Sequence, residues 1–198
     1  MKSIPQLPEG YIPTRTIDLQ NNKKAALTVH IIALLVFVLV IVGGLLAVPI
    51  TALLPVAGTS LAGTLFVLML KFVAILLGVI LYCMLQGLLM GLSVRVFGGA
   101  KVRFEMTGLY FCASSSAYFG RSAYIATALA PYLLWEILFA AGCFFIPTHW
   151  FWVVYFLLAL NMANATVCIY SICVLLRQPA GILIHDHGAS MTIYEPIK

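Results

Sequence analysis

FVAILLGVILYCMLQGLLMGLSVRVFGG, residues 72–99, begins as an uninterrupted apolar run and ends in a basic segment closed by two glycines. An apolar stretch of this length can cross the ~30 Å hydrocarbon core of a bilayer as a helix. A basic residue such as Arg95 at its end is typical of a helix that has reached an aqueous face. The stretch therefore predicts a membrane-spanning helix, and the rest of the chain is expected to pack around it.

The composition of the whole chain indicates a polytopic membrane protein. Of its 198 residues, 63% are hydrophobic and only 9% are charged, which is too apolar for a soluble domain. The five cysteines have no C-x-x-C spacing, and most lie inside apolar runs, so a disulfide framework is not expected. The net charge of +5 does not indicate nucleic-acid binding, because the Lys and Arg residues lie beside apolar runs. The lipid bilayer is the expected partner, with no nucleic acid.

The apolar runs and the breaks between them predict the domain organisation. A cytoplasmic N-terminal arm, residues 1–24, is expected to precede one membrane domain, residues 25–198, that ends in a cytoplasmic tail, residues 177–198. The expected spans are 25–48, 61–94, 124–146 and 150–176. The second span is long enough that it must tilt, break near Gly78 or project beyond the bilayer.

Two polar regions on the basic side of the membrane alternate in hydrophobicity. These regions, residues 101–113 and 182–194, are predicted to form small cytoplasmic β-hairpins. The predicted fold class is therefore an all-α membrane protein with four transmembrane helices and two small hairpins.

Basic residues are distributed very unevenly about the four predicted spans. Ten of the eleven Lys and Arg residues fall in the arm, the middle loop or the tail, and Lys71 is the exception. Because cytoplasmic loops carry the excess of Lys and Arg, both termini are expected to be cytoplasmic.

Two charged residues lie inside the predicted spans. An ionised carboxylate at Glu136 would cost at least ~2.5 kcal/mol without a partner, and Lys71 also lies in the outer half, so Lys71 is the candidate partner for an intramembrane ion pair. The alternatives are a Lys71 that reaches outward to the headgroups and a Glu136 bonded to a neighbouring helix.

In the fourth span, Asn161, Asn164 and Thr166 form a polar patch among alanines, which is typical of close helix packing.

Four segments resemble, in the same order, a bacterial family of membrane zincin metallopeptidases, domain of unknown function 3267 (DUF3267). They are LQGLLMGLSVRVFGGAKVRFE (85–105), YFCASSSAYFGRSAYIATALAP (110–131), NMANATVCIYSICVLLRQP (161–179) and DHGASMTIYEP (186–196). The resemblance implies an integral protein of the bacterial cell membrane. It also implies a zinc site with His, Glu and His at spacing i, i+1, i+4 and an Asp from the fourth helix. These positions hold Gln86, Gly87, Met90 and Cys168.

Two functions remain open from the sequence. In the first, the chain is a non-catalytic relative, a pseudoprotease that binds a peptide or a membrane-protein partner, and it needs no cofactor because the zinc ligands expected for the family are absent. In the second, it is a metalloprotein or hydrolase with different ligands, namely Cys83, Gln86, Met90 and Cys168, of which the sulfur donors would suit Cu(I). Enzyme activity is therefore undecided, and the replaced residues favour its absence. The polar patch of the fourth span is expected to face the turn that carries Gln86 and Met90.

Overall fold

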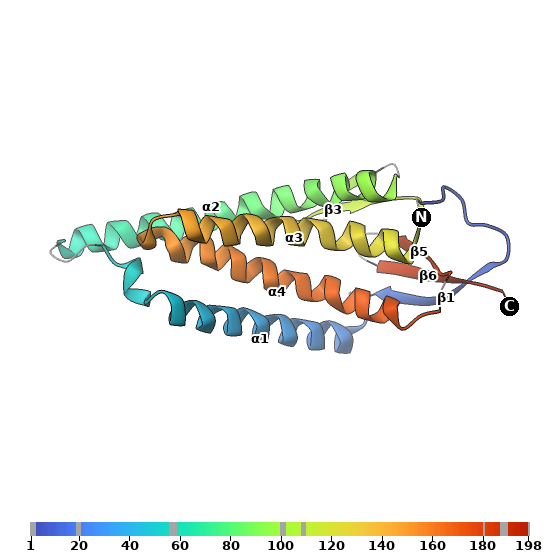
Figure 1. Ribbon diagram of the computed structural model, residues 1–198, viewed down its shortest axis with the longest axis horizontal. Coiled ribbons are helices and arrows are strands. Elements are labelled where there is room, and N and C mark those ends of the chain that lie inside the picture. The colour runs from blue at the N-terminus through green and yellow to red at the C-terminus, as the bar shows by residue number, and fades with distance from the viewer. Residues whose placement is uncertain are drawn as a thin grey trace.

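The fold is a bundle of four long helices with a small antiparallel sheet at one end (Figure 1). It is taken from a computed structural model that describes residues 3–18, 21–55, 59–99, 102–107, 110–179, 181–186 and 190–197. The two ends of the chain lie at the same end of the bundle, beside the sheet.

The four helices are α1 (Lys23–Ala47), α2 (Leu61–Ser93), α3 (Arg121–Phe145) and α4 (Phe151–Leu176). They confirm the four long apolar helices predicted from the sequence, with ends that differ by a few residues. Polar side chains begin two of them, because Asn22 accepts a hydrogen bond from the Ala25 N–H and Ser60 accepts one from the Gly63 N–H. Short 3-10 turns, Ile50–Leu53 after α1 and Thr148–Trp150 before α4, complete the connections.

The outer surface of the bundle is apolar. Large side chains on it are strongly exposed, among them Leu46 at 87% and Phe145 at 89%. Exposing this much apolar surface to water would cost roughly 25 cal/mol per Å², whereas hydrocarbon accommodates it without that cost. All four helices are long and apolar enough to cross a membrane, and their surfaces fit a lipid environment.

The helix α2 runs through Gly78 without a break. Its 33 residues span about 50 Å, well beyond the ~30 Å hydrocarbon core. Of the three alternatives predicted for this long span, the break at Gly78 is therefore wrong. Figure 1 shows α2 projecting past the other helices at the end remote from the sheet. At the sheet end, α2 continues as a π-helical turn, Val94–Gly98, which ends where Gly99 adopts a left-handed φ of 66°.

The sheet has four antiparallel strands in the order β1 (Tyr11–Asp18), β6 (Ser190–Pro196), β5 (Leu183–Asp186), β4 (Tyr118–Gly120). A separate hairpin joins β2 (Arg103–Thr107) to β3 (Tyr110–Ser114), and β3 runs along α2. Both predicted hairpins are therefore present, although their turns, residues 108–109 and 187–189, lie outside the described residues.

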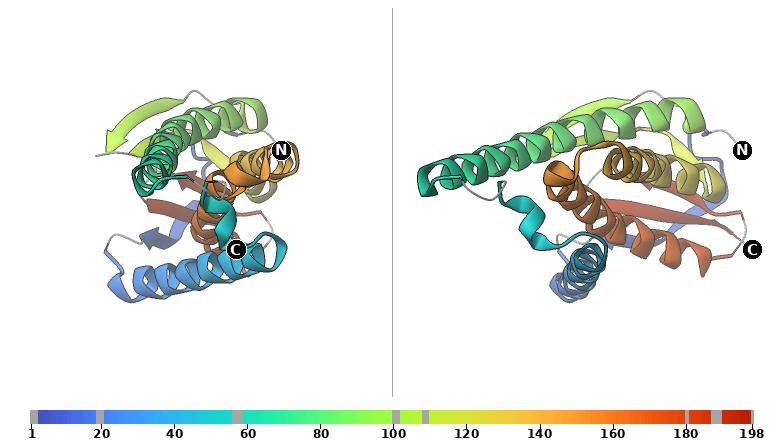
Figure 2. Two further views of the ribbon diagram at one scale, coloured as in Figure 1. Left: turned by 90° about the vertical axis from the view of Figure 1, so that its left-hand side faces the viewer. Right: turned by 60° about the vertical axis from the view of Figure 1, so that its left-hand side comes forward.

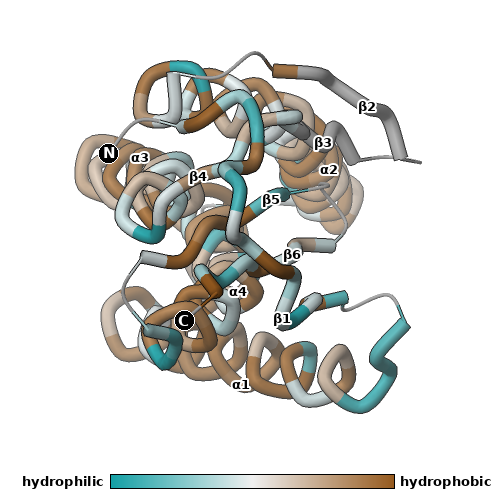
Figure 3. The backbone as a smooth tube through the Cα atoms, turned by 90° about the vertical axis from the view of Figure 1, so that its right-hand side faces the viewer, coloured by the Kyte–Doolittle hydropathy of each residue, from teal (hydrophilic) through white to brown (hydrophobic). Residues whose placement is uncertain are grey.

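The sheet corrects the predicted all-α class. The predicted N-terminal arm contributes β1, the edge strand, which pairs with β6 at the opposite end of the chain. β1 has Pro13 and several polar residues, so it lacks a clear alternation of its own, and its strand conformation depends on β6. The inner face of the sheet, with Phe119, Ile184 and Ile193, is buried against Tyr124 of α3 and Leu175 of α4. Figure 3 views this end of the molecule.

The helix α4 is the centre of the bundle. Figure 2 shows α1 on one side of α4 and both α2 and α3 on the other, and all three helices contact α4. The α1–α4 contact is close because Gly44 lies directly against the ring of Tyr155, whose hydroxyl donates a 2.7 Å hydrogen bond to the Val40 carbonyl.

We expect Gly44→Ala to destabilise the protein by about 1–3 kcal/mol, because the added methyl group would overlap the Tyr155 ring. Gly43→Ala is the matched control, since its Cβ would lie 3.7 Å from the Tyr155 hydroxyl, an ordinary contact. Both changes alter the intrinsic helix propensity equally, so the difference between their thermal unfolding curves in detergent isolates the overlap. Equal stability of the two variants would show that α1 does not pack against Tyr155.

Candidate functional site

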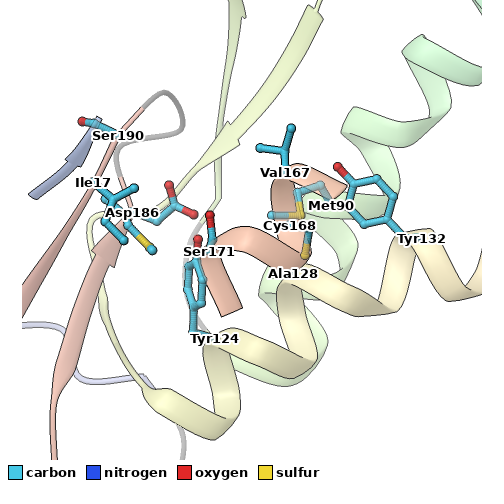
Figure 4. A pocket seen from close by; sticks show the side chains of 11 residues that line it. Ile17, Met90, Tyr124, Ala128, Tyr132, Val167, Cys168, Ser171, Asp186 and Ser190 are labelled. Carbon is cyan, nitrogen blue, oxygen red and sulfur yellow. The ribbon is translucent and has the colours of Figure 1, made fainter. Parts of the chain in front are cut away.

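A pocket of about 190 Å³ lies where α2, α3 and α4 meet the sheet (Figure 4). Its wall is apolar around Met90, Ala128 and Val167, and polar side chains gather around Asp186. It is lined by Ile17, Met90, Tyr124, Ala128, Tyr132, Val167, Cys168, Ser171, Asp186, Ser190 and Met191.

Two of the four predicted zinc-site positions line this pocket. Met90 enters from α2, and the buried Cys168 enters from α4. Met90 also packs against the hydrophobic cluster that contains Cys168. The other two positions lie on α2 but do not line the pocket. Gly87 is buried, and the Gln86 side chain interacts with Tyr132, which lines the pocket.

The polar end of the pocket was not predicted from the sequence. Asp186, the last residue of β5, lies close to the hydroxyl group of Tyr124 from α3 and interacts with it. Figure 4 shows Ser171 of α4 close by. The sequence does indicate where Asp186 points, because Ile182, just before β5, and Ile184 within it alternate with Asp186, and successive side chains of a strand point to opposite faces. That period places the carboxylate on the apolar, helix-facing side of the sheet.

The polar patch of α4 lies one turn further from the sheet than predicted. Asn161, only 1% exposed, accepts a 3.1 Å hydrogen bond from the Tyr82 hydroxyl, and Asn164 interacts with the same tyrosine. Thr166 is buried. The two asparagines therefore contact the Tyr82 turn of α2 instead of the Gln86–Met90 turn. The patch connects helices and does not complete the pocket.

The predicted ion pair between Lys71 and Glu136 does not form. The Lys71 amine donates to the backbone carbonyls of Leu53 at 2.6 Å and Ala52 at 3.4 Å, in the 3-10 turn after α1. A Glu136 carboxylate oxygen accepts a 2.9 Å hydrogen bond from Asn161. Tyr82 also bonds to this Asn161, and along α2 it lies roughly 16 Å from Lys71. Each charged group therefore has its own hydrogen-bond partner.

The residues at the predicted zinc positions do not fit zinc. A catalytic zinc site needs three nitrogen, oxygen or thiolate ligands and a general base. The predicted positions supply a thioether from Met90 and one thiol from Cys168, and Gly87 has no side chain to accept a proton. Asp186 adds one carboxylate at the polar end of the pocket. The Gln86 carbonyl oxygen is buried without a hydrogen-bond partner, but an amide is a poor zinc ligand. Within the described residues, no three His, Cys, Asp or Glu side chains are grouped to hold a metal ion.

The structure also separates the donors of the alternative soft-metal site. Cys83 packs against a second hydrophobic cluster around Tyr82, Trp135 and Leu157, whereas Met90 and Cys168 belong to the cluster next to the sheet. Along α2, Cys83 lies about 10 Å from Met90. Of the three sulfur donors, only Met90 and Cys168 are close together, which leaves a Cu(I) site incomplete.

The sequence of this chain matches one known protein family. The sequence pattern of DUF3267, described as "Putative zincin peptidase", matches residues 79–183, which include the sheet-side part of α2, all of α3 and α4 and most of the residues that line the pocket. The chain belongs to this family. Comparison with curated proteins and with solved structures finds no match.

Proposed function

We propose that the chain is a non-catalytic member of the zincin family, a pseudoprotease that binds a peptide segment or a membrane-protein partner without cleaving it. The observation that carries this proposal is the pocket itself. Met90 and Cys168 both line the pocket, at positions where the family resemblance implies metal ligands. They form an apolar, sulfur-rich wall and not a zinc ligand set. Binding can persist in such a site after catalysis has been lost.

The pocket has the chemistry to hold an extended peptide. An apolar side chain fits against Met90, Ala128 and Cys168, while the carboxylate of Asp186 can accept a hydrogen bond from a backbone N–H or from a basic side chain. The hairpin of β2 and β3, which runs along α2, offers a strand edge for main-chain pairing with the same segment.

A binding experiment tests this proposal. The purified chain in detergent should bind members of a library of short apolar and basic peptides and leave their masses unchanged. Ala128→Phe fills the pocket and should weaken binding at least tenfold, whereas Ala126→Phe, on the same helix but outside this pocket, should not. Asp186→Asn gives a milder second test if Ala128→Phe fails to fold. Peptide cleavage, or binding that neither pocket variant weakens, would overturn the proposal.

For its location, we propose a bacterial cell-membrane protein with both termini in the cytoplasm. The supporting observations are the uneven distribution of Lys and Arg and the two chain ends that lie beside the sheet. A cysteine introduced at Thr148, in the turn between α3 and α4, should react with an impermeant maleimide from outside intact cells. Tags at both ends should stay protected in the same cells, and external labelling of either tag would contradict this topology.

A further inference from the structure

A second groove, of about 570 Å³, lies at the free edge of the sheet. Arg15 and Ile17 of β1 form one wall, Lys23 and Lys24 at the start of α1 form another, and Tyr170 of α4 lies at its side. Figure 3 shows this hydrophilic start of α1 near β1 at the sheet end of the bundle. The groove uses none of the residues at the predicted zinc positions.

A β-bulge turns Arg15 toward the helices. The pairing of β1 with β6 shifts between Pro13 and Arg15, so that Thr14 is the extra residue. After the shift, Arg15 pairs with Ile193, which is fully buried on the helix-facing side of the sheet. Directly paired residues of antiparallel strands point to the same face. Arg15 therefore lies on the side of the sheet that faces the membrane-spanning helices, although it belongs to an exposed edge strand.

The start of α1 sets the depth of the groove in the membrane. The 25 residues of α1 span about 37 Å, and the apolar run begins directly after Lys24. Because this length exceeds the ~30 Å hydrocarbon core, Lys23 and Lys24 extend into the headgroup layer. Tyr170 lies about 9 Å before the end of α4, where tyrosines commonly line the membrane interface.

The charges in the groove favour an anion. Arg15, Lys23 and Lys24 are exposed cations, and Asp18 is the single acidic residue among the lining side chains described. The Asp18 carboxylate accepts hydrogen bonds of 3.1 and 2.6 Å from the backbone and side chain of Asn21. Three cations around one carboxylate leave the groove with an excess of positive charge at headgroup depth.

We propose that this groove binds the phosphate of an anionic phospholipid headgroup. Arg15 holds the phosphate from the sheet side, and Lys23 and Lys24 hold it from the helix side, while the acyl chains lie against the apolar surface of α1. The same phosphate chemistry occurs in free inorganic phosphate, but the groove opens at the membrane surface, where the local concentration of lipid phosphate is far higher.

Native mass spectrometry of the full chain in detergent tests this proposal. Titration with phosphatidylglycerol should show a first lipid bound about tenfold more tightly than phosphatidylcholine, and this preference should weaken with added salt. Lys23→Gln with Lys24→Gln should remove most of the preference, and Arg15→Gln alone should reduce it several-fold. Thermal unfolding of each variant establishes that it remains folded.

The matched control is Arg95→Gln with Arg177→Gln, which removes two exposed cations from the same end of the bundle but outside the groove. This variant should keep the preference for phosphatidylglycerol. An equal loss in the control would show a general surface-charge effect and overturn the assignment to this groove. If inorganic phosphate binds the lipid-free chain and displaces phosphatidylglycerol at millimolar concentration, the site is for a free anion and the lipid assignment is wrong.

Discussion

A chain that carries Gln86→His, Gly87→Glu, Met90→His and Cys168→Asp is expected to take up about one zinc ion per molecule, while the native chain takes up none. The reason is that α2 and α4 already hold two of these positions at the same pocket, so the type of ligand is the missing element. Zinc content after dialysis against a weak chelator measures this result. Full peptidase activity is not expected, because groups that orient each histidine can change affinity or activity by ~10 to 100-fold.

The control variant carries the same three substitutions in α2, but its Cys168 is replaced by Ala instead of Asp. This variant has the two histidines but lacks the carboxylate from α4, so its zinc affinity should fall at least tenfold below that of the complete set. Equal zinc binding by both variants would show that α4 does not contribute at this site. The correspondence between Cys168 and the third ligand of the family would then be wrong.

Asn161→Leu is expected to destabilise the protein by about 2 kcal/mol, because burying polar groups without partners is costly in a membrane interior. The Asn161 amide donates to the Tyr132 carbonyl at 3.0 Å and to Glu136 at 2.9 Å, and its oxygen accepts from Tyr82. The substitution removes all three hydrogen bonds, which join α2, α3 and α4. Unfolding by a denaturing detergent measures the loss.

Asn164→Leu makes the same chemical change less than one turn away, at an exposed position, and should cost less than half as much. Glu136→Gln should be mild, because the amide oxygen of glutamine can still accept the hydrogen bond from Asn161. Similar stability for Asn161→Leu and the native chain would show that the three helices are held together by packing alone.

The helices were predictable because their signal is local. An apolar run long enough to cross a bilayer, followed by Pro49 or Pro147, defines a span without knowledge of its neighbours. The close approach of Met90 and Cys168 was expected from the family resemblance, because the spacing within a helix gives a face but no partner. The pocket then depends on how α2 and α4 pack.

The incorrect predictions depend on contacts between distant parts of the chain. β1 becomes a strand because β6 pairs with it, and nothing within residues 11–18 indicates that partner. Lys71 and Glu136 were paired by charge alone, whereas backbone carbonyls and an asparagine amide satisfy them separately. Hydrogen bonds to neutral groups leave no pattern of opposite charges in a sequence.

The metal content and peptidase activity of the native chain test the central claim most directly. The chain should be purified without chelators, analysed for zinc and copper, and incubated with membrane-embedded and soluble peptide substrates. The proposed loss of zinc chemistry predicts far less than one metal ion per molecule and no cleavage above a heat-denatured control. Stoichiometric copper that is lost in Cys168→Ser would favour the soft-metal alternative. Stoichiometric zinc together with cleavage would contradict the pseudoprotease assignment.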